Sequence, residues 1–287
     1  MQITVKFDLS FKYAELEQLW RTSDRLGFEA IWDYDHFYGP IEHTDPTYEG
    51  WTALAAMAAV TEQARVGCLV SGVTYRNPAI LAKMAATVDH ISGGRLVFGL
   101  GAGWHEAEHR GYGIRFPSPG TRVAMVDEAL TVIRRLWTEE SVTFKGTFFN
   151  LQDAFCAPKP LQRPHPPIAI GGTEPKMLRV VARHADMWNM PAHEGPERWS
   201  DVNARLDEAC AEVGRRPAEI VRSAQLSLYP TEPAQVDNEL GLLPEFEQLG
   251  CEQMVLAFRE PPTMALLERC RALSYQTRIQ STSICAG

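Results

Sequence analysis

Residues 93–113, GGRLVFGLGAGWHEAEHRGYG, bring glycines and ionisable side chains together in one short segment. Residues 95–100 are a mostly apolar run typical of a buried strand, and its end carries glycines at the alternate positions 99, 101 and 103. Glycine lets a bulky or flat ligand come close to the backbone, because it has no side chain. Four ionisable residues follow at once: His105, Glu106, Glu108 and His109. This order is typical of the strand-to-helix junction of an α/β active site.

Two familiar motifs fit this segment only in part. The glycines are spaced GxGxGW, whereas the dinucleotide-binding fingerprint needs GxGxxG. Residues 105–109 match the zinc-protease pattern HExxH, which needs both histidines on one face of a long helix and a third ligand downstream. The glycines at 111 and 113 interrupt such a helix, and Arg115 occupies the place of the third ligand. We therefore expect no metal here; a solvated loop without a chemical role remains an alternative.

Asp35 and His36 directly follow a second apolar run at residues 29–33. An imidazole oriented by a nearby carboxylate can donate a hydrogen bond or move a proton near neutral pH, although a lone histidine is more often structural. No serine lies in a GxSxG elbow, so acyl transfer lacks a candidate nucleophile.

Gly171, Gly172 and Thr173 lie between an apolar run and a helix expected to begin at Pro175. Free backbone N–H groups and the helix dipole favour a phosphate group at such a place. A plain glycine turn is the alternative.

The rest of the chain alternates expected strands and helices. The expected strands are 3–9, 29–33, 66–73, 95–100, 168–170, 186–189, 221–229 and 253–258. The expected helices are 13–26, 51–61, 78–91, 122–137, 175–184, 198–213, 236–249 and 263–273. Eight such units predict a (β/α)₈ barrel, one domain over residues 1–273. A short inserted segment near 141–167 follows the fourth helix, and residues 274–287 are expected to fray.

The composition of the 287 residues excludes several classes of protein. Hydrophobic residues make up 45% and charged residues 22%, as in ordinary globular proteins. A net charge of -8 argues against a nucleic-acid partner. We see no secretory leader and no apolar run near twenty residues, so we expect a cytoplasmic protein without membrane contact. The six cysteines lack CxxC spacing and suit free thiols in a reducing compartment.

Several stretches in one order resemble the bacterial luciferase-like family, and within it the branch that depends on the deazaflavin coenzyme F420. They are WDYDHF, GVTYRNPAILAKMAATVDHISGGRLVFGLGAGWHEAEH, YGIRFP, APKP, PIAIGG and ARHADMWN, within residues 3–189. The series is specific for the family and less so for the cofactor, because members that use flavin mononucleotide (FMN) share the barrel.

The resemblance implies a flavin-like ring across the C-terminal mouth of the barrel, partly covered by the inserted segment. It implies a non-prolyl cis peptide at Cys68–Leu69 behind the ring, and Ser71 at the ring edge. It suggests these catalytic residues: Asp35, His36 and Glu108, the last at the acidic position of GW-x-x-x-E. It suggests these cofactor contacts: Asp35, His36, Cys68, Leu69, Ser71, Gly103, and the phosphate loop Gly171, Gly172 and Thr173.

The function implied is an F420-dependent oxidoreductase that passes a hydride to or from a small organic substrate, with His36 as the first choice for the proton. One alternative is an FMN-dependent monooxygenase that activates oxygen and is supplied by a separate reductase. The other is a non-catalytic flavin-binding barrel. We further expect a homodimer and a separate enzyme that reduces the cofactor.

Overall fold

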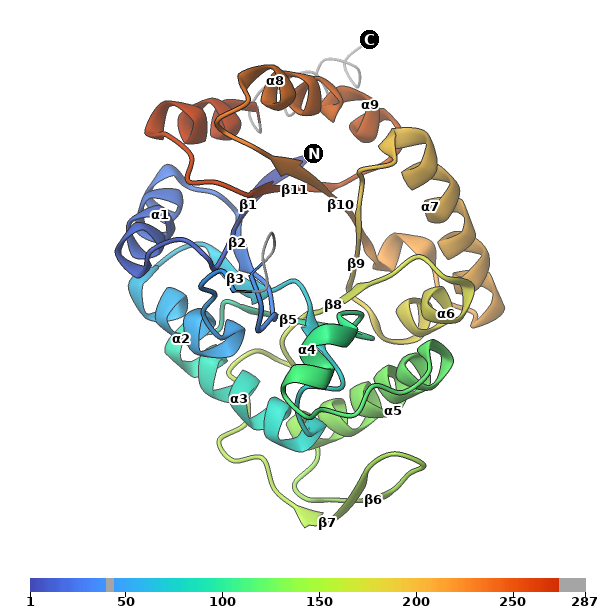
Figure 1. Cartoon of the computed structure of the whole chain (residues 1–287). Helices are drawn as coiled ribbons and strands as arrows, with labels where there is room; N and C mark the ends of the chain where they lie inside the picture. Colours follow the sequence, from blue (N-terminus) through green and yellow to red (C-terminus); the bar gives the residue numbers. More distant parts are fainter. Residues whose placement is uncertain (40–43, 274–287) are drawn as a thin grey trace.

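The structure is a computed structural model that describes residues 1–39 and 44–273. Its main sheet consists of these strands: β1 (Gln2–Phe7), β2 (Ala30–Asp33), β3 (Arg65–Cys68), β4 (Ser71–Gly72), β5 (Leu96–Gly101), β8 (Ile168–Gly171), β9 (Met187–Pro191), β10 (Val221–Leu228) and β11 (Gln253–Phe258). They pair in parallel in the order β3-β2-β1-β11-β10-β9-β8-β5-β4, and an additional β3–β5 pairing closes the barrel. Because β3 and β4 share one position, the described strands form the eight-stranded barrel that the sequence predicts (Figure 1).

Helices surround the barrel (Figure 1). They are α1 (Tyr13–Leu26), α2 (Gly50–Val60), α3 (Pro78–Ile91), α4 (Glu106–Gly111), α5 (Pro119–Thr138), α6 (Pro175–His184), α7 (Gly195–Glu212), α8 (Pro233–Gly241) and α9 (Leu243–Gln248). A short 3₁₀ helix spans Pro217–Glu219, and residues 264–273 are helical. No helix of the described residues combines the length and the apolar character needed to cross a bilayer.

Local capping explains where several helices begin. Asn77 accepts a hydrogen bond from the Ala79 N–H at 2.9 Å, and Pro78 occupies the first helical position of α3. Ser118 caps α5 in the same way, so this helix starts three residues earlier than predicted. Each capped start satisfies an N–H group that has no partner within its helix.

Three expected elements differ in the structure. The strand predicted at 66–73 is interrupted between β3 and β4 by a cis peptide bond between Leu69 and Val70. The helix predicted at 236–249 is two helices, because Pro244 has no N–H to continue the hydrogen-bond ladder of α8. Residues 106–111, for which we weighed a loop, form the short helix α4.

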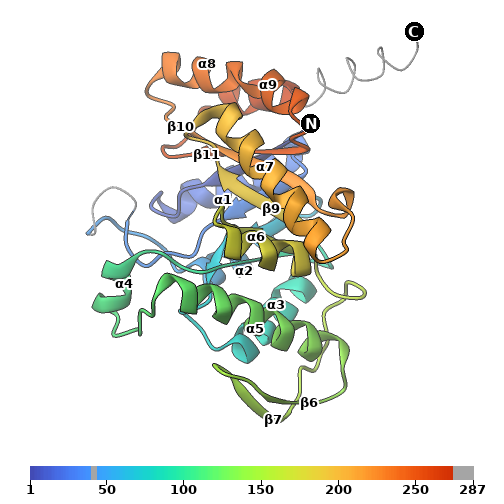
Figure 2. The same cartoon turned by 90° about the vertical axis from the view of Figure 1, so that its right-hand side faces the viewer.

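The inserted segment contains a hairpin of β6 (Val142–Lys145) and β7 (Asn150–Ala154). It lies outside the barrel, beside α3 and α5 and away from α4 (Figures 1 and 2). The Glu128 carboxylate of α5 accepts hydrogen bonds from the Phe148 and Phe149 N–H groups at 2.8 and 2.7 Å. The expectation that this segment covers the mouth is therefore wrong for the described residues, since hydrogen bonds hold it to the flank.

Side chains of β1 alternate between the barrel interior and the helices. Val5 and Phe7 belong to the large core under the helices, whereas Thr4, Lys6 and Asp8 are buried polar residues on the other face of the strand. The interior also holds a small apolar cluster: Ala30, Trp32, Leu69, Val97, Ala169, Met187 and Val255. The interior of the barrel is thus polar along β1.

Candidate active site

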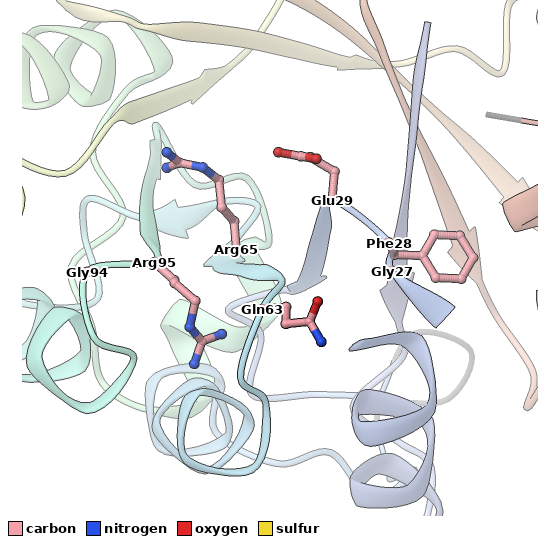
Figure 3. Close-up of a pocket in the computed structure, with 7 residues that line it drawn as sticks. All are labelled: Gly27, Phe28, Glu29, Gln63, Arg65, Gly94 and Arg95. Carbon is pink, nitrogen blue, oxygen red and sulfur yellow. The ribbon is translucent and has the colours of Figure 1, made fainter. Parts of the chain in front are cut away.

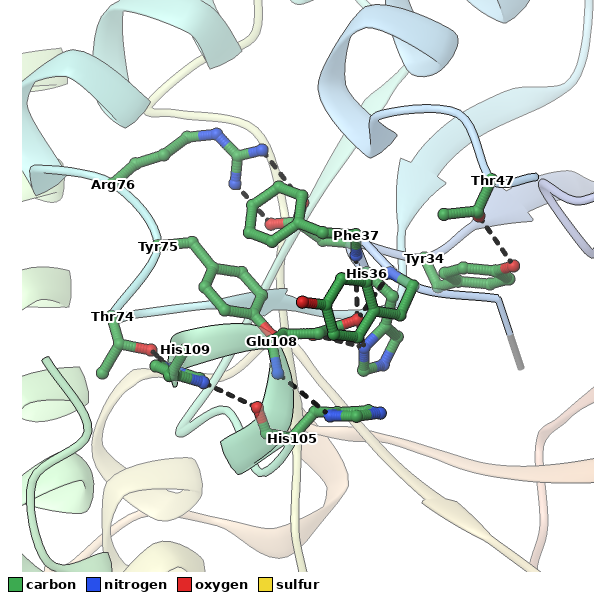
Figure 4. A network of polar contacts seen from close by, with 12 residues as sticks. Tyr34, His36, Phe37, Thr47, Thr74, Tyr75, Arg76, His105, Glu108 and His109 are labelled. Atoms are coloured by element: carbon green, nitrogen blue, oxygen red, sulfur yellow. Dashed lines mark hydrogen bonds and ion pairs between the residues drawn. The ribbon is translucent and has the colours of Figure 1, made fainter. Parts of the chain in front are cut away.

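His36 and Glu108 meet at the C-terminal mouth of the barrel (Figure 4). His36 follows β2, and Glu108 lies on α4 just beyond β5. The imidazole Nδ1 of His36 lies 3.1 Å from each carboxylate oxygen of Glu108. The two residues are 72 positions apart in the chain, so only the fold of the barrel brings them into contact.

Glu108 is fully buried and accepts several hydrogen bonds besides the one from His36. The backbone N–H groups of Phe37 and Tyr38 donate to Oε1 at 2.9 and 3.0 Å, and the Tyr75 hydroxyl donates to Oε2. Burial alone would raise the pKa of Glu108, but the hydrogen bonds from His36, Tyr75 and the Tyr38 backbone outweigh it and lower the pKa to about 2. The residue is thus a carboxylate at neutral pH.

The ionised Glu108 determines which nitrogen of His36 faces it. A carboxylate only accepts hydrogen bonds, so Nδ1 carries a hydrogen and Nε2 is left to gain or lose a proton. The His36 side chain is 25% exposed, and its ring packs against Tyr34 and Trp104 with centroids 5.5 and 5.4 Å away. Trp104 itself is 69% exposed at the mouth.

Asp35 does not orient His36 as we expected. Its carboxylate forms a bidentate ion pair with Arg76, with Oδ2–Nη1 at 2.5 Å and Oδ1–Nη2 at 2.9 Å. Burial raises the pKa of Asp35, and the hydrogen bonds and charge of Arg76 oppose that rise. Arg76 also pairs with Glu49, which caps α2. Asp35 therefore holds the segment after β2 to α2, and Glu108 is the carboxylate that orients His36.

The two histidines of the HEAEH motif do not converge with Glu106 on one point. His105 lies before α4 and its side chain accepts from the Glu108 N–H at 3.4 Å. His109 is buried; its Nδ1 lies 2.8 Å from the His105 carbonyl oxygen and its Nε2 lies 2.6 Å from Thr74 Oγ1. Residues 1–39 and 44–273 contain no group of three or more histidine, cysteine or acidic side chains arranged to hold a metal ion.

The residues expected behind the cofactor ring face in different directions. Leu69 belongs to the interior cluster, and the cis bond follows it rather than preceding it. Cys68 is buried in the core under the helices. Ser71 is also buried, and its Oγ accepts from Trp51 Nε1 on α2 at 2.8 Å, so its side chain faces α2 instead of the ring edge.

The glycine segment after β8 has the features of a phosphate loop. Gly172 has φ 138°, which is unfavourable for any residue with a side chain, and a Cβ there would lie 2.6 Å from Met177 Cγ and displace the Met177 side chain. Glu174 precedes α6 and forms no side-chain cap; its carbonyl oxygen accepts from the Met177 and Leu178 N–H groups, and the helix dipole favours an anion at this end of α6. Gly103, with φ 72°, has its carbonyl oxygen held by Arg122 Nε at 3.1 Å, and this contact fixes the backbone just before Trp104.

Sequence reasoning missed Tyr75 and Arg76, which support Glu108 and Asp35. The sequence feature that could have indicated them is an aromatic and a cationic residue just after the strand predicted at 66–73. It also missed Lys6, a charged residue at an inward position of the apolar strand β1.

A separate open pocket of about 400 Å³ lies at the opposite, N-terminal end of the barrel (Figure 3). It is lined by residues before or at the start of β2, β3 and β5: Gly27, Phe28, Glu29, Gln63, Arg65, Gly94 and Arg95. Arg95 is fully engaged there, donating to the carbonyl oxygens of Ala58 and Thr61 at the end of α2. This end of a barrel contributes to stability rather than to chemistry.

Residues 3–247 match the family model described as luciferase-like monooxygenase. F420-dependent glucose-6-phosphate dehydrogenase of Kineococcus radiotolerans is 32% identical over 219 residues, which cover 74% of this chain. The chain spans only 63% of the length of that relative.

Two solved structures share the fold. An F420-dependent secondary alcohol dehydrogenase, in complex with an F420-acetone adduct, aligns with TM-score 0.81 and 19% identity over 95% of this chain and 98% of its own. A monooxygenase of Streptomyces bottropensis aligns with TM-score 0.73 and 21% identity over 95% of this chain and 97% of its own. The chain therefore belongs to the luciferase-like family, as its motifs suggested.

Proposed function

We propose that this chain is an oxidoreductase that uses coenzyme F420 to move a hydride to or from a small organic substrate. The observation that carries the proposal is the pair of His36 and Glu108, a half-buried imidazole held by a fully buried carboxylate at the mouth. The names of the dehydrogenase from Kineococcus and of the solved alcohol dehydrogenase support F420 over other cofactors.

His36 performs the proton transfer in this proposal. In alcohol oxidation, Nε2 takes the hydroxyl proton while Nδ1–H stays bonded to Glu108, whose negative charge stabilises the imidazolium that forms. In carbonyl reduction, the imidazolium returns that proton to the oxygen. The cofactor, when bound, supplies or accepts the hydride.

The residues at the mouth fit such a cofactor. The uncapped start of α6 and Gly171–Thr173 would bind its phosphate, and the backbone around Leu69 and Gly103 would lie beside its ring. Trp104, exposed beside His36, would exclude water from the reacting groups.

The second candidate is an FMN-dependent monooxygenase supplied by a separate reductase. The description of the family and the barrel of the Streptomyces monooxygenase favour it. When the chain reduces a carbonyl or acts as a monooxygenase, a separate enzyme is expected to reduce its cofactor, and the family resemblance favours a homodimer.

Calorimetric titration of the purified chain with F420 and FMN, followed by anaerobic turnover of a panel of alcohols and ketones, tests the proposal. We expect F420 to bind at least about tenfold more tightly than FMN, and substrate to turn over without oxygen. Equal or tighter FMN binding with oxygen consumption supports the monooxygenase instead. Binding of F420 without turnover of any substrate supports the non-catalytic barrel.

A further inference from the structure

Lys6 extends into the interior of the barrel close to its axis. Its Nζ donates to the Leu69 carbonyl oxygen and to Gln225 Oε1, both at 3.0 Å. Leu69 follows β3, and Gln225 lies on β10, which is four positions away around the eight-stranded barrel. An ammonium that bridges opposite walls lies near the axis, and Lys6 and Leu69 are both at the C-terminal ends of their strands.

The acidic groups around Lys6 offset its positive charge only in part, because a second cation, Arg259, lies close by. Burial, together with the neighbouring charge of Asp35, raises the pKa of Asp33 at the end of β2 well above its usual range, which disfavours its charged form. Burial likewise raises the pKa of the Cys68 thiol at the end of β3, which keeps it neutral. Asp8, after β1, also favours the charged form of Lys6, and it is shared with the second cation, Arg259.

Arg259 follows β11 and places Nη1 3.7 Å from Asp8 Oδ2, while its Nε and Nη2 both lie 3.2 Å from Ser227 Oγ. Asp8 Oδ1 is already occupied by the Ser10 N–H and the Tyr34 hydroxyl. One carboxylate thus faces two cations, at the end of the barrel that carries His36.

Burying an ammonium without its own counter-ion is costly, and an apolar side chain would fill this position at no such cost. Burial and the repulsion by Arg259 lower the pKa of Lys6 to about 8. A negative charge arriving at the mouth would relieve this strain on the ammonium.

We infer that Lys6 and Arg259 form a pair of cations inside the barrel, below its C-terminal mouth. Their positive charge holds the ring of the bound cofactor in its anionic form. The inference rests on the proposed function, because it takes F420 as the ligand. The oxidised deazaflavin ring carries an acidic hydroxyl whose charge spreads over the whole ring. A cation on the barrel axis would lie below a ring that crosses the mouth. It would therefore attract the charge of the ring in any orientation of the ring within the mouth.

The test is a pH titration of the visible absorbance of oxidised F420 bound to the purified full-length chain. Loss of the ring proton changes this spectrum, so its midpoint reports the pKa of the bound ring. We expect Lys6→Met to raise that midpoint by about one pH unit relative to the unsubstituted chain. Lys6→Arg keeps the charge and should leave the midpoint unchanged, as should Gln225→Met, which removes only a hydrogen-bond partner.

Isothermal calorimetry of the unsubstituted chain gives a second test that needs no substituted protein to fold. At pH 8.5, in buffers of different ionisation enthalpy, F420 binding should take up about half a proton, since an anionic ligand raises the pKa of Lys6. At pH 6.5 the uptake by Lys6 should vanish, because the ammonium is already protonated.

Each other outcome has a distinct meaning. If the chain does not bind F420, the proposed function fails. If F420 binds but neither the midpoint nor the proton uptake behaves as expected, the inference about Lys6 is overturned. Lys6→Met could instead leave the midpoint unchanged and raise the KM of a carboxylate-bearing substrate but not of its neutral amide. In that case the two cations bind a substrate anion, and the assignment to the cofactor ring is wrong.

Discussion

The Nδ1 atom of His36 lies 3.1 Å from both carboxylate oxygens of Glu108, and the carboxylate has no exposed surface. A symmetric contact of this kind fixes the plane and the tautomer of the imidazole together. Only Nε2 is then free to exchange a proton with a ligand. The same carboxylate also accepts from backbone N–H groups of residues 37 and 38, so the loop that carries His36 is held in position by the group that orients its ring.

His36→Asn should abolish most turnover while it changes cofactor affinity little. Asparagine keeps a hydrogen-bond donor and much of the shape but cannot transfer a proton, so we expect kcat to fall by about 10²–10⁴-fold. Steady-state kinetics and cofactor titration measure the two quantities. His90→Asn, on the flank of the barrel in α3, is the matched control. Parallel losses of affinity and rate would instead make His36 an anchor for the ring.

Glu108 should contribute a pH-dependent part of the stability. Its pKa lies at about 2 in the folded chain against 4.5 for an ordinary glutamate, so its contribution is complete above pH 4.5 and is lost as the pH falls toward 2. Between these values the slope reaches about 1.4 kcal/mol per pH unit. Denaturant unfolding at several pH values should show a steeper loss for the unsubstituted chain than for Glu108→Gln. Equal slopes would contradict the depressed pKa.

The fold was predictable because its signals are local. The bounds of α1, α3 and α6 match the prediction, since Gly27, Asn77–Pro78 and Pro175 mark their ends with residues whose backbone preferences need no tertiary context. The pair of His36 and Glu108 had no such signal. It depends on α4 folding back onto the loop after β2, which only closure of the barrel determines.

The direction of Ser71 could not be predicted for a related reason. Side chains of a regular strand alternate between two faces, so the facing of Ser71 should follow from Val66. The strand is interrupted between β3 and β4, and a shift of the alternation by one residue reverses the facing of every later side chain. The family resemblance implied Ser71 at the ring edge, and an unbroken strand over 66–73 would not have contradicted it, whereas the structure turns the Ser71 side chain toward α2.

Gly172→Ala should weaken cofactor binding at the phosphate loop. A Cβ at this position would lie 2.6 Å from Met177 Cγ, and φ 138° is unfavourable for any residue with a side chain. The loop backbone or the Met177 side chain must then shift, and we expect F420 affinity to fall at least about tenfold by fluorescence titration. In Gly241→Ala the added Cβ meets nothing within 4 Å, so affinity should stay unchanged. An unchanged affinity in Gly172→Ala would remove this loop from the cofactor site.

The purified chain should contain no stoichiometric zinc. His109 uses both ring nitrogens, toward Thr74 and the His105 carbonyl oxygen, and Glu108 is committed to His36. Elemental analysis should find far less than one zinc per chain, and chelators should leave turnover unchanged. One tightly held zinc per chain, with loss of activity on chelation, would overturn this assignment of HEAEH.

Ser71→Ala should destabilise the fold without weakening cofactor binding. The buried Trp51 indole N–H would lose its acceptor at 2.8 Å, which costs about 1–3 kcal/mol of unfolding free energy. Trp51→Phe removes the donor, so in the double variant the two losses should be less than additive. Denaturant unfolding measures the cycle, and F420 titration of each variant supplies the control. If Ser71→Ala weakens F420 binding while Trp51→Phe does not, Ser71 contacts the ring and the orientation toward α2 is wrong.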